Sequence, residues 1–395
     1  MTRNGPATRA GVGTRAISAL LTAAVAGSVY RSACAVDRRR RVVPLRDARS
    51  RSAAPATVTV VVPARNEAAV LDDCLHAIRS QTYSRDGGLR LVVVDDDSSD
   101  ATGEIAHRHA REDACVSVVR TAGPPPGWTG KVHAMHAGIE AAGAPQPGEW
   151  LLFVDADTVL GPEALERLLA TALAVDADLV STPGGPPRGH SLSWPLLVPP
   201  AMQMIGENAD PDGAGGKAFA IGHCILVRRE QYTKMGGWEA LASRRNEDIA
   251  LATAVRDCGG TTRTVDGLDH VTTTGMDPFG QGWGSFRKSF MAATRGSIPV
   301  LLGGGLGQIA LALAAPAAVV AGARSRRRWL TAVGAAGWVA QSVAHQQNAD
   351  LMRSAPWLAP LAPLTGALFG GVLVDGAIRS LRGTGSWKGR PDTRA

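Results

Sequence analysis

Two carboxylates follow a short apolar run near the middle of the chain. Leu151 to Val154 are apolar, and Asp155 and Asp157 come next with one alanine between them. When a strand ends in acids at positions i and i+2, a bend in the chain can bring both carboxylates to the same side. There their oxygens can bind a hard divalent cation. An isolated pair of this kind is common by chance, so its position relative to other strands decides its meaning.

A second acidic cluster, Asp95 to Asp100, follows the apolar run Leu91 to Val94. The carboxyl edge of a parallel sheet is where open α/β sheets bind ligands. Asp100 and Ser99 are also suitable caps for the next helix, and this alternative stays open for them and, with less weight, for Asp95 and Asp96. The first strand ends in Pro63 to Glu67 without a Gly-rich turn, which argues against a dinucleotide-binding hydride-transfer enzyme.

Alternating apolar runs and helical periods from Thr57 onward predict βαβ units with a largely parallel sheet. Asp155 and Asp157 therefore end one strand of a series, which strengthens the cation hypothesis. The predicted strands are 58–62, 91–94, 116–119, 151–154, 179–181 and 219–227; the predicted helices are 68–80, 101–111, 132–142, 162–174 and 247–257.

Long uncharged segments at both ends predict membrane helices. Ala16 to Tyr30 is apolar but short, Arg31 interrupts it, and arginines at 38–41 favour a membrane anchor with a cytosolic flank over a processed leader or an interfacial helix. Residues 298–322, 329–344 and 356–374 are apolar enough to enter a bilayer. We expect 298–322 to re-enter on the same side, because both basic clusters, 324–328 and 379–394, then face the cytosol.

The composition agrees with a membrane protein. Lys and Arg total 42 against 35 Asp and Glu, a net charge of +7, and the arginines cluster beside apolar runs. Aromatics do not interleave with them, so we expect no nucleic-acid partner. The five cysteines form no CxxC pair and no zinc spacing, which indicates ordinary thiols. His133 and His136 lie one helical turn apart without a third ligand, and with His223 and Cys224 they are interpreted as ordinary residues.

Several motifs resemble family 2 glycosyltransferases, which have the GT-A fold. "VVVPARNE", "VVVDDDSSDAT" and "LLFVDADT" appear in the family's order, and the resemblance covers about 57–289. Within the family, "PPGWTGKVHAMHAGIEAA", "AIGHCILVRREQYTKMGGWEAL" and residues 387–390 are similar to the hopanoid-associated and carotenoid (diaponeurosporenoate-type) members. The resemblance implies an α/β GT-A nucleotide-diphospho-sugar transferase domain, with membrane helices at its C-terminal side and a short apolar helix at its N-terminal side.

This resemblance implies roles for individual residues. Asp248, preceded by Glu247, matches the acidic pair whose Asp is the general base, although an acid at a helix start also complements the helix dipole. Asp157, with Asp155, would hold Mg²⁺ or Mn²⁺ at the diphosphate. Lys131 would meet the diphosphate or nucleoside, its alternative being an exposed lysine that opens a helix. The nucleotide-sugar pocket would comprise Pro63, Ala64, Asn66, Glu67, Asp95, Asp96, Lys131 and Asp155.

The chain departs from the family's processive synthases because "GQGWGSFRKS" has no QxxRW order. Trp283 and Lys288 there, and Trp194 in the uncharged segment 194–205, are candidate acceptor or interface residues. An interfacial helix is an equally good interpretation of Trp283 and Lys288. The segment 194–205 contains two prolines and is too short to span, so we expect it at the interface or along an apolar groove.

These inferences predict four parts: an anchor and basic linker (1–54), a catalytic domain (55–297), membrane helices (298–378) and a basic tail (379–395). The expected activity is inverting transfer from a nucleotide sugar, UDP-hexose first, to a lipid such as a carotenoid or hopanoid. The expected location is the cell membrane, multi-pass, with the catalytic domain cytosolic. Two alternatives remain: a polyprenyl-phosphate glycosyltransferase, and a non-catalytic membrane scaffold that retains the fold.

Overall fold

The computed structural model describes residues 7–47, 56–83, 88–187, 189, 191–213, 218–276, 278–382, 386–387 and 390–391. The chain forms two compact units. One is an α/β unit of residues 41–190, 208–277 and 386–395, and the other is a helical unit of residues 1–40, 191–207 and 278–385. Parts of the basic tail and of the 387–390 motif, including Lys388 and Gly389, lie outside the described residues.

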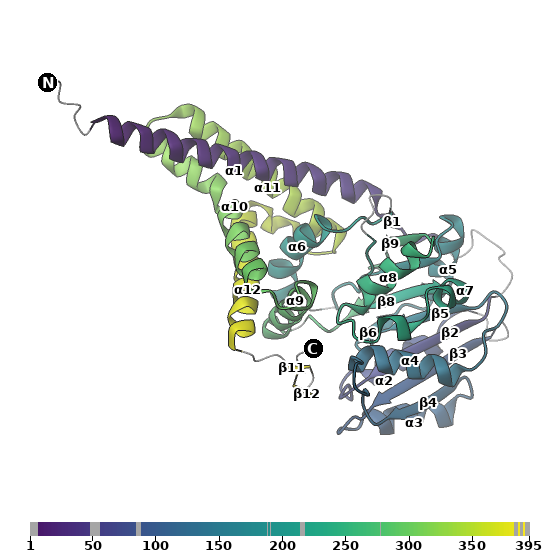
Figure 1. Ribbon diagram of the computed structural model, residues 1–395. Helices are drawn as coiled ribbons and strands as arrows, with labels where there is room; N and C mark the ends of the chain where they lie inside the picture. Colours follow the sequence, from purple (N-terminus) through teal and green to yellow (C-terminus); the bar gives the residue numbers. More distant parts are fainter. Residues whose placement is uncertain are drawn as a thin grey trace. The chain divides into compact units, whose positions relative to one another are not determined.

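A mixed sheet forms the centre of the α/β unit, and eight strands in the described residues take part in it (Figure 1). Only β8 runs antiparallel to its neighbours, β5 and β7. The other pairs are parallel, as the alternating pattern predicts. The strand order is β1 (Val43–Pro44), β9 (Thr262–Asp266), β7 (Leu179–Thr182), β8 (Cys224–Arg228), β5 (Trp150–Val154), β2 (Val58–Ala64), β3 (Leu89–Asp96), β4 (Val116–Thr121).

Helices cover both faces of this sheet, and successive strand residues divide between two cores. Val60 and Val62 pack in one core, while Val61 between them packs in the other. This alternation follows from the two-residue period of a strand. The first face carries α2 (Leu71–Arg79), α3 (Thr102–Glu112) and α5 (Ala164–Ala174). The second carries α4 (Gly130–Ala142), α7 (Arg229–Lys234), η3 (Trp238–Leu241) and α8 (Glu247–Asp257).

Two minor pairings complete the α/β unit. The pair β6 (Thr158–Leu160) and β10 (Val271–Thr273) is antiparallel, as is the pair β11 (Ser386–Trp387) and β12 (Arg390–Pro391). One predicted strand, 219–227, is wrong at its start, because β8 begins only at Cys224. Backbone groups of Ile221, Gly222 and His223 bond instead to Ser181, Asp248 and Asp155. The pattern also missed β1, β6, β9 and β10.

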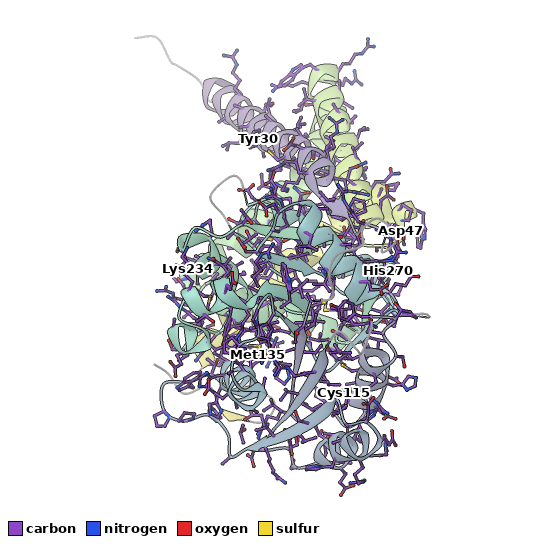
Figure 2. All side chains as sticks on the ribbon, turned by 90° about the vertical axis from the view of Figure 1, so that its right-hand side faces the viewer. Tyr30, Asp47, Cys115, Met135, Lys234 and His270 are labelled. Carbon is purple, nitrogen blue, oxygen red and sulfur yellow. The ribbon has the colours of Figure 1, made fainter. Side chains whose placement is uncertain are left out.

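In the helical unit, three helices among the described residues are long and apolar enough to cross a membrane, over 15–41, 298–324 and 356–382. Large apolar side chains such as Leu20 and Leu364 are exposed on them, as is Tyr30 (Figure 2). The unit comprises α1 (Ala7–Arg41), α6 (Ser193–Gly206), α9 (Phe279–Ala293), α10 (Ile298–Arg324), α11 (Arg328–Leu351), η4 (Pro356–Leu361) and α12 (Ala362–Arg382).

One expectation about these helices is wrong. The helix α10 runs unbroken for 27 residues, about 40 Å, so the chain does not turn back within 298–322. Arg31, which interrupts the first apolar run, lies within α1; its guanidinium is 2.5 Å from the Glu207 carboxylate and donates to Gln308 Oε1 at 2.9 Å. Both partners belong to the helical unit, which is how a cation is accommodated in an apolar helix.

Small residues allow α10 and α12 to cross closely. A Cβ on Gly305 of α10 would lie 2.8 Å from the Gly370 carbonyl oxygen of α12, and a Cβ on Gly370 would lie 2.8 Å from the Gly305 carbonyl oxygen. Neither position has room for a side chain. Crossings of this kind between small residues are typical of helices that pack inside membranes.

Candidate active site

The turn after β5 places Asp155 and Asp157 at the carboxyl end of the strand, as predicted. Leu151 to Val154 are buried in the sheet. The Asp155 amide donates to the His223 carbonyl oxygen at 3.1 Å, and the Thr158 amide donates to the Asp155 carbonyl oxygen at 3.0 Å. These two bonds fix the backbone on both sides of the acidic pair.

Lys131, in the first turn of α4, joins this strand end to α8. Its Nζ lies 2.7 Å from Asp155 Oδ1 and 2.7 Å from Glu247 Oε1. Burial opposes the charged form of this lysine, but the two carboxylates outweigh burial and raise its pKa well above the usual value. Lys131 is therefore a fixed cation between two carboxylates, and the interpretation as an exposed lysine is wrong.

Asp248 lies beside this group at the start of α8. Its Oδ2 accepts from the Gly222 amide at 3.1 Å, and its Oδ1 accepts from the Ile249 amide at 2.8 Å. Burial, reinforced by the neighbouring charge of Glu247, raises the pKa of Asp248 to about 7, against a smaller opposing effect of Lys131. Both amide bonds hold the carboxylate in one orientation, and its pKa is close to that of an efficient base at neutral pH.

Asp157 presents a buried carboxylate oxygen without a partner among the described residues. Its Oδ1 has no hydrogen bond, and burial followed by the charge of Asp155 raises the pKa of this carboxyl. Gly275 leaves the necessary room, because a Cβ there would lie 2.3 Å from Asp157 Oδ2. An unsatisfied buried oxygen beside a second carboxylate fits a hard divalent cation.

The two carboxylates are not part of a larger set of protein ligands among the described residues. Within the part of the chain that the structure describes, no three His, Cys, Asp or Glu side chains converge as a metal site. Magnesium in particular is often held by one or two carboxylates while water and substrate phosphates complete its coordination. Asp155 and Asp157 match that pattern.

His223 is a residue of this site that the sequence did not reveal. Its Nδ1 accepts from the Gly184 amide at 2.9 Å, so in the neutral ring the proton is on Nε2. Its carbonyl oxygen accepts from the Asp155 amide. The only sequence signal was the proximity of His223 to a glycine, which is too weak to distinguish it from a structural histidine.

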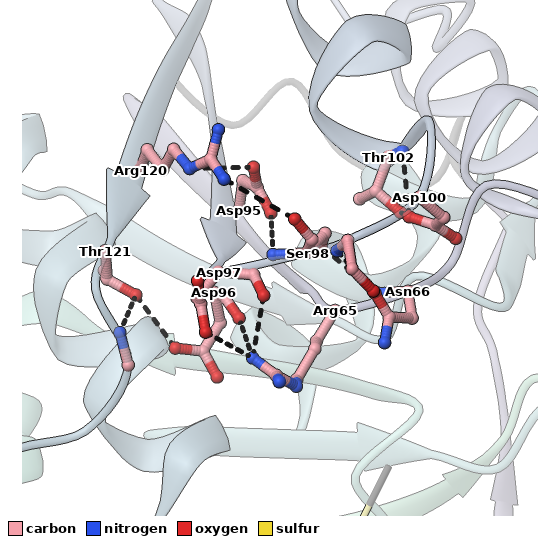
Figure 3. A network of polar contacts seen from close by, with 12 residues as sticks. Arg65, Asn66, Asp95, Asp96, Asp97, Ser98, Asp100, Thr102, Arg120 and Thr121 are labelled. Carbon is pink, nitrogen blue, oxygen red and sulfur yellow. Dashed lines mark hydrogen bonds and ion pairs between the residues drawn. The ribbon is translucent and has the colours of Figure 1, made fainter. Parts of the chain in front are cut away.

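The candidate nucleoside-binding loops follow β2 and β3 (Figure 3). Pro63 and Ala64 end β2, and the register places Ala64 opposite Asp95. Asn66 has a positive φ of 52°, and its Oδ1 accepts from the Ser99 amide at 2.9 Å. The Glu67 amide donates to Thr102 Oγ1 at 2.8 Å. These bonds join the two loops into one surface.

Asp95 and Asp96 face opposite ways, as successive strand residues must. Asp95 Oδ1 accepts from the Ser98 amide at 2.9 Å, and a Cβ on Gly103 of α3 would lie 2.8 Å from Asp95 Oδ2. Asp96 Oδ1 instead accepts from the Thr121 hydroxyl at 2.8 Å. Asp100 Oδ1 accepts from the Thr102 amide, the first amide of α3, at 3.0 Å. This bond agrees with the alternative that Asp100 caps the helix.

The three candidate acceptor residues belong to the helical unit. Trp283 Nε1 donates to Asp375 Oδ2 at 2.9 Å, and Arg287 donates to the same oxygen at 2.8 Å, so these residues of α9 are tied to α12. Trp194 is buried, and its Nε1 donates to the Met352 carbonyl oxygen at 2.9 Å. Lys288 is exposed on α9. Asp375 was not anticipated from the sequence.

Comparison with known proteins identifies the domain that carries this site. The family model "Glycosyl transferase family 2" matches residues 59–236. The glycosyltransferase GlyG of Streptococcus pneumoniae is 31% identical over 123 residues, which are 31% of this chain and 37% of that protein. The 4,4'-diaponeurosporenoate glycosyltransferase of Staphylococcus aureus is 27% identical over 242 residues, 60% of each chain. The chain thus spans between about a third and two thirds of the length of these relatives.

A solved structure has the same fold. The mannosyltransferase PcManGT from Pyrobaculum calidifontis, in complex with GDP-Man and Mn²⁺, superposes with a TM-score of 0.55 at 21% identity. The superposition covers 94% of this chain and 100% of that one, and it confirms the expected GT-A fold. The strand-end carboxylates and the bridging lysine agree with these matches, and residues 59–236 form a domain that matches glycosyl transferase family 2.

Proposed function

We propose that this protein is an inverting glycosyltransferase that moves a hexose from a nucleotide sugar, UDP-hexose first, to a lipid acceptor. The observation that carries the proposal is that Asp155 after β5, Lys131 of α4, and Glu247 and Asp248 at the start of α8 converge in the unit that contains the family 2 match. The matched relative from Staphylococcus aureus, named for a carotenoid acid, and the three apolar helices support a lipid acceptor.

The donor would lie along the loops after β2 and β3. Asp96, held by Thr121, would accept hydrogen bonds from the base or ribose, whereas Asp95 is occupied by Ser98 and supports the loop. Asn66 and Glu67 shape the same surface through their bonds to the β3 loop. Lys131 would place its positive charge near the diphosphate.

Asp155 and Asp157 would hold Mg²⁺ or Mn²⁺, and the cation, when bound, would neutralise negative charge on the departing diphosphate. The fit rests on the unpartnered Asp157 oxygen and on the room left by Gly275. The presence of Mn²⁺ in the PcManGT complex supports the same class of cation.

Asp248 would act on the acceptor. Its carboxylate takes the proton of the acceptor hydroxyl while that oxygen forms a bond to the anomeric carbon and the bond from that carbon to the diphosphate breaks. The bonds from Gly222 and Ile249 aim the carboxylate before substrate arrives. Glu247 is held by Lys131 and would serve mainly to place that lysine.

The helical unit would hold the protein and its acceptor at the cell membrane, with several helices crossing and the catalytic domain on the cytosolic side. The arginines at the C-terminal end of α1, at 38–41, support that orientation. Trp194 and Trp283 are internal ties between helices, so we propose that they shape the acceptor surface indirectly.

Mass spectrometry of lipid extracts tests this function. Cells lacking the protein are complemented with the wild-type chain or with Asp157→Asn. We expect one glycolipid to be missing from the deletion strain and to return only with the wild type. Loss of a glycosylated polyprenyl phosphate instead would support the polyprenyl-phosphate alternative. No change in any glycolipid would contradict lipid glycosylation, and absence of metal-dependent UDP-sugar hydrolysis as well would support a non-catalytic scaffold.

A further inference from the structure

The turn Gly127–Lys131 is bonded at three points to the segment that leads into Asp248. The Thr129 amide donates to the Ala242 carbonyl oxygen at 2.8 Å, and the Thr129 hydroxyl donates to the Arg244 carbonyl oxygen at 3.1 Å. Two residues later, Lys131 meets Glu247. The turn therefore holds both the backbone before α8 and the first acid of α8.

Aromatic packing fixes the same turn to α4. The Trp128 ring lies 4.9 Å from the His136 ring and 5.7 Å from the His133 ring, measured between centroids. Gly127 permits the sharp bend because its φ is +87°. The turn is thus packed on α4, the helix that also carries Lys131. Its bonds to the segment 242–246 therefore connect that segment to α4.

Thr129 is not one of the residues proposed to hold the cation or to act as the base. Its hydroxyl is committed to the Arg244 carbonyl oxygen, which lies four residues before Asp248. Arg244 to Asn246 have exposed or half-buried side chains, so few packing contacts replace the two hydrogen bonds of Thr129. Thr129, the residue before α4, thus bonds to that segment through both its amide and its hydroxyl.

We propose that Thr129 is a positioning residue, which sets the base Asp248 relative to the donor-side group of Lys131 and Asp155. The proposal rests on the proposed glycosyl transfer. When substitution of a residue that does not touch the substrate misplaces a catalytic group by about 1 Å, the rate falls by about 100-fold. One exposed hydrogen bond changes the folding equilibrium by much less than this factor. Loss of the Thr129 hydroxyl should therefore lower turnover while donor binding and folding persist.

The kinetic test compares Thr129→Val, Thr129→Ser and the control Thr233→Val in the full-length protein in membranes. Thr233 on α7 also donates its hydroxyl to a backbone carbonyl, that of Arg229, at 2.9 Å. We expect Thr129→Val to lower kcat by about 10- to 100-fold with the donor KM within about twofold of wild type. Thr129→Ser should restore most of kcat, and Thr233→Val should match wild type.

Hydrogen exchange supplies a readout that does not depend on activity. We expect amides of 243–250 to exchange several-fold faster in Thr129→Val than in wild type, Thr129→Ser or Thr233→Val. Unchanged exchange there, or a Thr129→Val protein with wild-type kcat, overturns the positioning role. An equal loss of UDP affinity and kcat also overturns it, because the defect is then general. A wild-type protein without transfer activity contradicts the proposed function instead, and the exchange result then decides the positioning role alone.

Discussion

Replacing Asp248 by Asn removes the proposed base while keeping the shape of the side chain. The amide oxygen can still accept one of the two bonds now donated by Gly222 and Ile249, so the fold should persist. General base catalysis contributes about 100- to 10,000-fold to a rate. We expect kcat of Asp248→Asn to fall by that factor for an acceptor with an alcohol nucleophile.

The pH dependence of kcat in the wild type is a second test of Asp248 as the base. Burial and the charge of Glu247 raise the pKa of Asp248 to about 7, so the active anion forms only as pH rises through that value. Between pH 6 and pH 8 the ionised fraction grows about tenfold, and kcat should rise by about the same factor. The rise should be absent from Asp248→Asn, because amides do not titrate in this range.

The assay follows labelled sugar from donor into the organic phase, with full-length protein in membranes and saturating donor. Glu230→Gln on α7 is a matched control, because it removes an exposed acid from the same unit. An Asp248→Asn protein that keeps most of its activity with an acceptor shown to be an alcohol would refute the base assignment. Retained activity is expected only if the acceptor is a carboxylic acid, which is already ionised near neutral pH.

Three other changes test separate parts of the site and of the helical unit. Asp157→Asn should abolish the gain in UDP affinity that Mn²⁺ produces in calorimetry, and wild-type turnover without added metal would contradict its role. Gly222→Ala places a methyl 3.3 Å from Lys131 Nζ and 3.6 Å from Asp248 Oδ2, so kcat should fall about tenfold at an unchanged melting temperature; full activity would show that the site tolerates the methyl. Asp375→Asn weakens the bonds from Trp283 and Arg287 and should destabilise the protein in detergent by about 1–3 kcal/mol, measured by thermal unfolding, with donor KM unchanged; an unchanged melting curve would contradict the tie between α9 and α12.

The strands that carry the site were predictable because buried parallel strands leave continuous apolar runs in the sequence. Asp95, Asp96, Asp155 and Asp157 follow such runs, so their place at the carboxyl edge followed from topology alone. The sequence left open which of Asp95 and Asp96 faces the ligand. In the structure Asp95 bonds to the Ser98 amide and lies 3.8 Å from Arg120 Nε, whereas Asp96 bonds to the Thr121 hydroxyl.

Contacts between distant segments were not predictable. Lys131 bridges two carboxylates that are far from it in the sequence, and Gly222 and His223 act through backbone groups that leave no residue-type signal. The helix α9, expected with the catalytic domain, groups with the helical unit, as does α6. The partners of Arg31, Glu207 and Gln308, are likewise far from it in the sequence and could not be read from a local pattern.

Transfer of label from a panel of nucleotide sugars to extractable lipid is the most direct test of glycosyl transfer at this site. Wild type, Asp157→Asn and Asp248→Asn are incubated in membrane vesicles with Mn²⁺, and the anomeric configuration of the product is determined by NMR. We expect one donor to label lipid with inverted configuration in the wild type only, for an alcohol acceptor. A product with retained configuration, or equal labelling by all three proteins, would contradict the assignment of Asp157 and Asp248.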